Sequence, residues 1–182
     1  MDNFYTSEMI KYDYQAIKNM QPVCLFLIGL PGSGKTTFRD NFLRDISSNG
    51  CRNEWVTISP DSFIERYAEN TQSTYSESFT EASIFANLHA MMVFEKAVDR
   101  MESVIIDRTN TNILSRSKYL PKITDSYKKV SVNIGAPYDR IIQVNEERKE
   151  IGRCVPDSVL NRMIDNYEPP SLDEGFDAVY KL

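Results

Sequence analysis

The stretch that most restricts the fold runs from an apolar segment through a glycine-rich turn into an amphipathic segment. Residues 23–30 read VCLFLIGL, a continuous apolar run of the kind found in a parallel strand that is covered on both faces. The turn GLPGSGKT at 29–36 has the spacing G-x-x-x-x-G-K-[ST]. In the next segment, 35–47, apolar residues recur at helical spacing. A strand, a glycine-rich turn and a helix in this order predict a loop that binds phosphate.

Each position of this loop has a chemical task. Gly32 and Gly34 allow backbone angles, and a close approach to phosphate, that a side chain would block. The N–H groups of the loop can then point at phosphate oxygens, helped by the positive N-terminus of the helix. Lys35 is expected to reach the β- and γ-phosphates of ATP, and Thr36 to offer its hydroxyl to Mg²⁺. The expected nucleotide-binding residues are Gly29, Pro31, Gly32, Ser33, Gly34, Lys35, Thr36 and Thr37.

Strands and helices alternate along the rest of the chain. Helical patterns separate further runs that predict strands, at 54–59, 103–107, 128–137 and 177–182. This alternation predicts an α/β fold, a three-layer P-loop NTPase sandwich of the nucleoside- or nucleotide-kinase type. It would have a mainly parallel five-stranded sheet with helices on both faces. We expect a single domain at 21–182, preceded by an N-terminal arm or helix at 1–20.

Local patterns make three predictions for the middle of the chain. The polar, Ser/Thr-rich segment 70–81 is expected to be a mobile loop. The segment 112–127 is expected to be a helix that kinks or breaks at Pro121. Between them a long helix is expected, and apolar residues near one side should face the core. These residues are Ile84, Leu88, Met91, Val98 and Met101, with Phe85, Met92 and Phe94 widening the side.

Composition narrows the class of protein. The formal net charge of −5 gives no support to broad, nonspecific binding of a polyanion, although it does not exclude a local basic groove. The cysteines Cys24, Cys51 and Cys154 are odd in number and form no C-x-x-C, so we expect reduced thiols in a cytoplasmic protein. No apolar run is long enough to cross a membrane, and the N-terminal residues show no signal-peptide pattern.

Asp61 lies just after the second predicted strand, in the stretch ISPDSF. Ligands of such sheets bind outside the carboxyl ends of the strands, so this acid is a candidate site residue. A purely local explanation is also good, with Ser59 as the N-cap and Pro60 as the first helical residue. Asp61 would then be a first-turn anion at the positive end of the helix. The stretch alone leaves both interpretations open.

Asp107 ends the apolar run SVIID and is the second candidate acid. In P-loop proteins an acid at this place orients Mg²⁺, often through a water molecule. The alternative is a cap on the next helix, but Asn110 and Asn112 lie nearer that helix and could cap it instead. We therefore expect Thr36 and Asp107 to form the metal site.

A phosphate-binding loop alone does not identify the reaction. The N-K-x-D motif that reads guanine is missing, no D-x-x-G follows the third predicted strand, and the chain is small for a motor core. These observations favour a kinase in the size class of nucleoside and nucleotide kinases.

Five stretches in order make a more specific resemblance. They are GLPGSGKTT, ISPDSF, VIIDRTNTNILSR, ERKEIGRCVP and YEPPSLDEGFDAV. Together they resemble the P-loop polynucleotide-kinase family, which includes phage-type 5′-hydroxyl polynucleotide kinases and the kinase half of polynucleotide kinase/phosphatase. Zeta-toxin-like and AAA-type P-loop kinases are relatives of this group. The resemblance covers about residues 22–180, nearly the whole chain.

The resemblance implies roles for particular residues. The general base on the acceptor hydroxyl would be Asp61, and the acid-x-Thr-Asn segment would be Asp107, Thr109 and Asn110. The arginine a few residues further on would be Arg116.

The resemblance also implies a lid over the ATP phosphates, at about 146–156. Arg148 and Arg153 match the lid arginines in region. Arg148 could instead be a solvated charge on a helix face, whereas Gly152, just before Arg153, could let a lid move. The expected catalytic residues are Lys35, Asp61, Arg66, Arg116, Arg148 and Arg153.

The sequence departs from the family at one place on the acceptor side. The phage-type enzyme has an essential arginine three residues after the base, where this chain has Ile64. The nearest arginine is Arg66, which could act from another side of the turn. Either Arg66 substitutes for the missing side chain or the acceptor differs.

These observations predict an ATP- and Mg²⁺-dependent kinase that phosphorylates a hydroxyl, with the 5′-OH end of a nucleic acid as the leading acceptor. A small-molecule or nucleoside kinase is the second interpretation, and a nucleotide-binding regulator without transfer chemistry is the third. Tyr75 and Phe79 could form an acceptor-side flap that stacks on bases, although a plain mobile loop explains the segment as well.

A basic cluster could flank a polyanion, although such sets are commonly solvated surfaces. Its members are Arg108, Arg116, Lys118, Lys122, Lys128 and Lys129.

Overall fold

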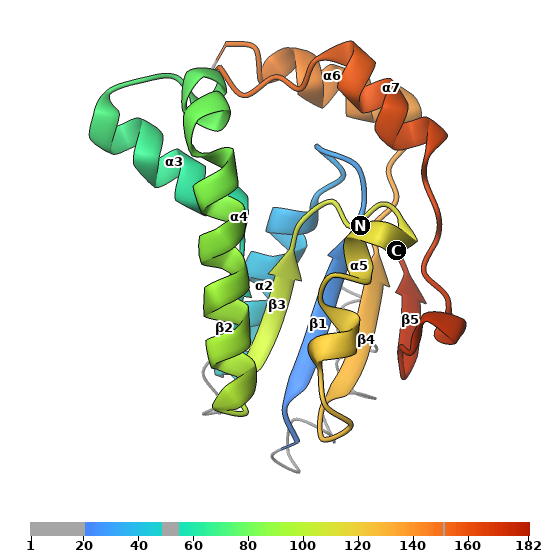
Figure 1. Ribbon diagram of the computed structural model, residues 1–182. Helices are drawn as coiled ribbons and strands as arrows, with labels where there is room; N and C mark the ends of the chain where they lie inside the picture. The colour runs from blue at the N-terminus through green and yellow to red at the C-terminus, as the bar shows by residue number, and fades with distance from the viewer. Residues whose placement is uncertain (1–20, 49–54, 151) are drawn as a thin grey trace.

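The computed structural model describes residues 21–48, 55–150 and 152–182, and their core is a five-stranded sheet (Figure 1). Every neighbouring pair of strands is parallel, in the order β2-β3-β1-β4-β5. The predicted α/β class with a parallel five-stranded sheet is therefore confirmed. The strands are β1 Val23–Ile28, β2 Trp55–Ile58, β3 Ser103–Asp107, β4 Lys128–Asn133 and β5 Ala178–Lys181.

Helices cover both faces of the sheet and one of its ends. In Figure 1, α2 lies behind the sheet, α4 and α5 lie in front, and α6 and α7 pass over the carboxyl ends of the strands. Helices α6 and α7 therefore shelter the side of the sheet where ligands of such sheets bind. The helices are α2 Lys35–Ser48, α3 Pro60–Thr71, α4 Tyr75–Asp99, α5 Ile113–Arg116, η1 Leu120–Lys122, α6 Tyr138–Glu147, α7 Asp157–Asp165 and η2 Leu172–Glu174.

The central strand β1 is buried along its whole length and supplies both cores. Side chains of a strand alternate between its two faces. Its odd-numbered residues pack with Phe42 and Ile46 of α2, and its even-numbered residues pack with Phe94 of α4 and with Tyr119. The continuous apolar run of the sequence is thus explained by burial on both sides.

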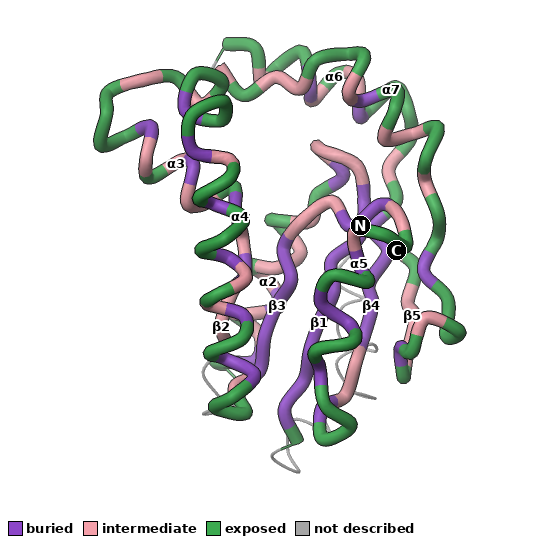
Figure 2. Tube along the Cα trace, in the orientation of Figure 1, coloured by how far each residue is buried: buried purple, intermediate pink, exposed green. Residues whose placement is uncertain are grey.

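Helix α4 faces the core with small residues, which contradicts our prediction for most of its large apolar side chains. The buried positions recur about every four residues, at Ser78, Ala82, Ala86, Ala90, Phe94, Ala97 and Val98. By contrast, Ile84, Leu88, Phe85 and Met92 are 59–71% exposed. Figure 2 shows exposed stretches alternating with buried ones along α4. Small side chains let α4 approach its neighbours closely, so the large ones point outward. Of the predicted set, Val98 and Phe94 do lie in the core, whereas Met101 is exposed.

The segment 70–81 is mostly helical, which corrects its prediction as a loop. Helix α3 continues to Thr71, the chain turns at Gln72 with φ 54°, and α4 already begins at Tyr75. Thr74 caps α4, because its side chain accepts from the backbone N–H of Glu77 and the Glu77 carboxylate accepts from the backbone N–H of Thr74. This T-x-x-E capping box is a helix-start signal that the Ser/Thr content of the segment obscured.

Several smaller predictions can also be compared with the structure. The segment 112–127, predicted as a helix that kinks or breaks at Pro121, is helical only in the short α5 and in η1. The α-helix ends at Arg116, before Pro121, which lies within η1. Cys24 and Cys154 are free thiols. None of the described helices is both long enough and apolar enough to span a bilayer. The predicted N-terminal arm 1–20 and Cys51 lie outside the described residues.

Candidate active site

The glycine-rich loop joins the carboxyl end of β1 to the first turn of α2, as its sequence predicts. Gly32 has φ +81°, and a Cβ built on it would approach Cγ1 of Val144 in α6 to 2.9 Å. A residue larger than glycine at position 32 would therefore have a strained backbone, and its side chain would also be too close to Val144 of α6. The loop is also anchored from behind, since the Gly29 N–H donates to the Thr109 carbonyl at 2.9 Å.

The loop contains groups that suit a bound phosphate. The Ser33 Oγ is buried and has no hydrogen-bond partner among the described residues. A buried hydroxyl normally has such a partner. Thr36 and Thr37, at the start of α2, are exposed. Backbone N–H groups, a lysine and hydroxyls together form a donor set that fits the phosphates of a nucleotide.

Lys35 lies at the centre of the candidate site. Its Nζ donates to the carbonyls of Gly29 and Leu30, at 2.9 and 2.8 Å, within its own loop. Burial lowers the pKa of Lys35 to about 8, while the carboxylates of Asp107 and Asp61 raise it and the guanidinium of Arg148 lowers it. The structure thus brings these three predicted side chains within electrostatic reach of the lysine.

Asp107 ends β3 next to the loop and is paired with an arginine that the sequence analysis missed. Arg39 Nη1 lies 2.6 Å from Asp107 Oδ2, and the Asp107 side chain is only 8% exposed. Burial raises the pKa of the Asp107 carboxyl above its ordinary value, and the nearby cations Arg39 and Lys35 oppose that shift. Arg39 follows Lys35 by four residues, hence by one helical turn, and this spacing was the available signal.

Thr36, in the first turn of α2, and Asp107, at the end of β3, are the residues that we predicted to hold Mg²⁺. A hydroxyl and a carboxylate are hard ligands of the type that Mg²⁺ takes, together with waters and substrate phosphates. Within the described residues no cluster of three or more His, Cys, Asp or Glu could hold a metal by itself. These residues therefore fit a metal that is held jointly with a nucleotide, rather than an all-protein cage.

Asn110 supports the site from beneath rather than capping a helix. It is 1% exposed with φ 48°, and its Nδ2 donates to the carbonyls of Leu27 and Ile106 at 2.8 and 3.2 Å. The amide thus links the ends of β1 and β3, from which the loop and Asp107 emerge. The cap of α5 is Asn112, whose Oδ1 accepts from the Ser115 N–H at 2.8 Å.

Asp61 lies in the first turn of α3, at the carboxyl end of β2. Ser59 caps this helix by accepting from the Ser62 N–H at 3.3 Å, and Pro60 is in its first turn. The predicted helix-start geometry is therefore confirmed. It also directs Asp61 to the edge of the sheet where Lys35 lies, so the structural and functional interpretations are compatible.

The two lid arginines lie in different surroundings. Arg148 ends α6 and is close enough to Lys35 to affect its pKa, which places it on the side of the phosphate loop. Arg153 instead lies on the side of α3, where its Nη2 is 3.1 Å from Oε1 of Glu65. Gly152, which directly precedes Arg153, has φ +66°, so the backbone turns sharply at this glycine. The structure thus separates an arginine near Lys35 from an arginine beside α3.

Position 64 lies inside the core. Ile64 is 1% exposed, so its side chain packs under α3 and does not face the site. Arg66 is exposed, and its Nε donates back to the Ser62 carbonyl at 3.3 Å. Among the described contacts, none joins Arg66 to Asp61, so the structure does not bring Arg66 into the site.

Arg116 is a structural residue in this conformation, not a residue in contact with the site. It is fully buried, with Nε and Nη2 donating to the two carboxylate oxygens of Glu174 at 2.6 and 2.7 Å. Its Nη1 donates to the carbonyls of Asn110 and Glu168. Arg116 therefore joins the end of β3 to the C-terminal segment, and its effect on the site would be indirect, through Asn110.

The predicted basic cluster does not form one free surface. Arg116 is buried, Arg108 donates to the Tyr119 hydroxyl at 2.9 Å, and Lys122 is paired with Glu95 at 2.7 Å. Lys129 lies 3.5 Å from an oxygen of Asp125. The cluster thus gives little support to an extended polyanion-binding face.

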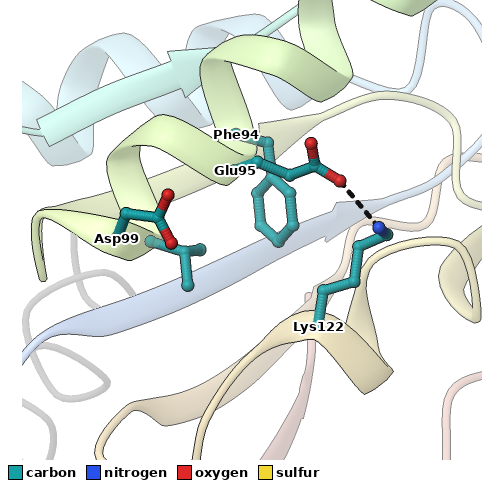
Figure 3. A pocket seen from close by; sticks show the side chains of 5 residues that line it. Phe94, Glu95, Asp99 and Lys122 are labelled. Atoms are coloured by element: carbon teal, nitrogen blue, oxygen red, sulfur yellow. Dashed lines mark hydrogen bonds and ion pairs between the residues drawn. The ribbon is translucent and has the colours of Figure 1, made fainter.

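A separate pocket lies away from the candidate site. It has a volume of about 280 Å³ and is lined by Phe94, Glu95, Val98, Asp99 and Lys122 (Figure 3). These residues belong to the last turns of α4 and to η1, whereas the phosphate loop follows the carboxyl end of β1. None of the expected nucleotide-binding residues therefore lines this pocket.

Comparisons with known proteins agree with the fold described above. The sequence model of the AAA domain family matches residues 25–170. Chaetomium thermophilum Kti12 in complex with ADP-AlF3 has a similar fold, with a TM-score of 0.61 and 19% identity over 87% of this chain and 88% of that chain. A structure of the PezAT chromosomal toxin-antitoxin system of Streptococcus pneumoniae has a TM-score of 0.62 and 18% identity over 100% of this chain and 78% of that chain.

The Pnkp1/Rnl/Hen1 RNA repair complex also contains a similar chain, with a TM-score of 0.55 and 23% identity over 80% of this chain and 44% of that chain. At such identities the likenesses establish a shared P-loop NTPase fold. The family match extends over most of the chain and includes both the phosphate loop and Asp107. The chain belongs to the AAA domain family of P-loop proteins.

Proposed function

We propose that this protein is an ATP- and Mg²⁺-dependent kinase whose acceptor is the 5′-hydroxyl end of a nucleic acid. The observation that carries the proposal is the position of Asp61, whose charge acts on Lys35 of the phosphate loop together with that of Asp107. A protein that only binds nucleotide needs the loop and Asp107 but has no use for a second carboxylate on the acceptor side.

The proposed roles follow from the charge that develops during phosphoryl transfer. The transition state is loose, with negative charge spread over the transferred group, so positioning and charge neutralisation supply most of the catalysis. Lys35 and Arg148 would contact the transferred phosphoryl oxygens. Asp61 would accept a hydrogen bond from the acceptor hydroxyl and take its proton. Mg²⁺, when bound by Thr36 and Asp107, would neutralise the β- and γ-phosphates.

A nucleic-acid acceptor is supported by the ordered stretches that resemble polynucleotide kinases, from GLPGSGKTT to YEPPSLDEGFDAV. The similar fold in an RNA repair complex is consistent with it. The second candidate, a small-molecule or nucleoside kinase, is favoured by one specific observation. Ile64 is buried where the phage-type enzyme has an arginine, and Arg66 does not replace that arginine in this structure.

The test measures γ-phosphate transfer from ATP to 5′-hydroxyl RNA and DNA oligonucleotides, nucleosides and sugars. We expect transfer to oligonucleotides, and we expect Asp61→Asn to lower its rate by about 10²–10⁴-fold while ATP affinity stays within a few-fold. Asp125→Asn, a change to an exposed carboxylate on another part of the surface, serves as the matched control.

Two results would contradict the proposal in different ways. Transfer to a small molecule but to no oligonucleotide would refute the acceptor and favour the second candidate. If ATP binding survives Asp61→Asn and no acceptor is phosphorylated by the parent chain, the protein is a nucleotide-binding regulator instead.

A further inference from the structure

The acceptor side of the site contains a network that extends beyond Asp61. The hydroxyl of Tyr75, the first residue of α4, donates to Oδ1 of Asp61 at 3.0 Å. The guanidinium carbon of Arg153 lies 6.0 Å from the centre of the Tyr75 ring, within cation–π range. Arg153 is also paired with Glu65, one turn after Asp61 on α3. Tyr75 thus joins the expected base to an arginine of the lid.

A second contact fixes the lid to the same end of α4. The Ser76 hydroxyl donates to the Gly152 carbonyl at 3.0 Å, and the Thr74 side chain lies close to Gly152. The cap of α4 and the turn of the lid are therefore in direct contact. The start of α4 therefore contacts both Gly152 and Arg153.

The chemistry of the Tyr75 contact suits a permanent donor. Burial raises the pKa of the Tyr75 phenol well above its ordinary value, and the neighbouring Asp61 carboxylate raises it further, so the phenol stays protonated at neutral pH. An ionised carboxylate only accepts hydrogen bonds and has two oxygens. One oxygen of Asp61 is held by Tyr75, which leaves the other for an incoming hydroxyl.

We propose that Tyr75 is a positioning residue for phosphoryl transfer: its hydroxyl fixes the carboxylate of Asp61 through one oxygen while its ring contacts Arg153, so that the other oxygen of Asp61 stays free for the acceptor hydroxyl. Phe79, 49% exposed and with its ring centre 6.1 Å from that of Tyr75, supports the ring from the next turn of α4. The inference rests on the proposed function, because it requires Asp61 to act on an acceptor hydroxyl.

The test compares two tyrosine variants of the full chain. Tyr75→Phe removes the hydroxyl but keeps the ring beneath Arg153. Tyr67→Phe is the matched control, because the Tyr67 hydroxyl also joins α3 to a carboxylate of α4, Glu81 Oε2 at 3.2 Å, but not to Asp61. Steady-state kcat and the KM values of ATP and acceptor are measured with whichever acceptor the parent chain phosphorylates, together with thermal unfolding.

We expect Tyr75→Phe to lower kcat about tenfold or more, since a hydrogen bond to a charged group is lost, with the KM of ATP and the melting temperature unchanged. Tyr67→Phe should leave kcat unchanged. A purely structural role for Tyr75 would lower the melting temperature and leave kcat per folded molecule unchanged, and that result would overturn the inference. So would equal kcat values for Tyr75→Phe and the parent.

Failure of the inference can be told apart from failure of the proposed function. If the parent chain phosphorylates oligonucleotides and Tyr75→Phe has the parent's kcat, the function stands and the role of Tyr75 is refuted. If the parent phosphorylates only a small molecule, the acceptor class is refuted while the comparison of variants still decides the role of Tyr75. If it phosphorylates nothing, both are refuted.

Discussion

At the scale of single residues, Lys35 has a charge that depends strongly on its surroundings. Its Nζ donates to two carbonyls of its own loop, and burial lowers the pKa of Lys35 to about 8. A phosphate oxygen would stabilise the cation and raise that pKa again. Nucleotide binding should therefore be coupled to proton uptake at alkaline pH.

This coupling gives a prediction with a definite sign. Below pH 7 Lys35 is already protonated in the free protein, so its charge adds no pH dependence to ATP affinity there. Above pH 8 a proton must be taken up, and we expect the Kd of ATP to rise about tenfold per pH unit. Binding measured between pH 7 and 9.5, with Lys35→Arg for comparison, tests this. Arginine stays protonated throughout, so an equal slope for Lys35→Arg would contradict the assignment to Lys35.

Arg39 shows what single-residue reasoning can miss. Its sequence neighbourhood reads as an ordinary charged position on an amphipathic helix, yet its side chain is paired with Asp107 at 2.6 Å. Four residues after Lys35 is the same side of α2, and the strand that ends in Asp107 neighbours β1 in the sheet. The spacing from Lys35 was visible in the sequence, but predicting the pair also required the order of the strands, which a linear sequence does not state.

At the scale of elements, α4 packs through a seam of alanines. Ala82, Ala86 and Ala90 are at most 4% exposed, and they recur at intervals of one turn. The sequence pattern suggested the wrong side of α4 because the large apolar residues form a stripe of their own, opposite the alanines. In a helix that lies close to its neighbours, the small residues mark the interface.

A larger side chain in this seam should be costly. Ala86 is fully buried, so we expect Ala86→Leu to lower the free energy of unfolding by about 1–3 kcal/mol through overpacking. Ile84→Ala on the outer stripe is the control, and since Ile84 is 71% exposed it should change stability by about 0.5 kcal/mol or less. Denaturant unfolding of both variants measures the difference. A larger loss for Ile84→Ala than for Ala86→Leu would mean that the outer stripe is the packed side.

At the scale of the whole molecule, the sequence predicted the class of fold and the strand ends that carry the site. Lys35 and Asp61 come after predicted strands and Asp107 ends one, and parallel strands bring their carboxyl ends to one edge. The side-chain contacts that connect distant parts of the chain could not be predicted from the sequence. Tyr75 reaches Asp61 from another helix, and Arg116 reaches Glu174 across 58 positions, so both contacts depend on how distant elements pack.

The Arg116–Glu174 pair should contribute strongly to the stability of the whole domain. Arg116 is fully buried, and Glu174→Gln would leave its guanidinium without a counterion, so we expect a loss of about 3–5 kcal/mol. Glu95→Gln breaks a pair of similar length at the surface, where both side chains are about half exposed, and should cost about 1 kcal/mol or less. Chemical denaturation of the two variants compares them. Equal losses would show that the buried pair contributes no more than the exposed one.

The same pair has a consequence for how the protein is made. During synthesis Arg116 leaves the ribosome many residues before Glu174, so a nascent chain carries an unpaired guanidinium at a place that becomes fully buried. The carbonyl of Glu168, its other distant partner, also arrives late. Asn110, whose carbonyl binds Arg116, links the ends of the two strands that flank the phosphate loop. We therefore expect the nucleotide-binding loop to acquire its final shape only after the segment that contains Glu168 and Glu174 has emerged, even though the loop is translated before that segment.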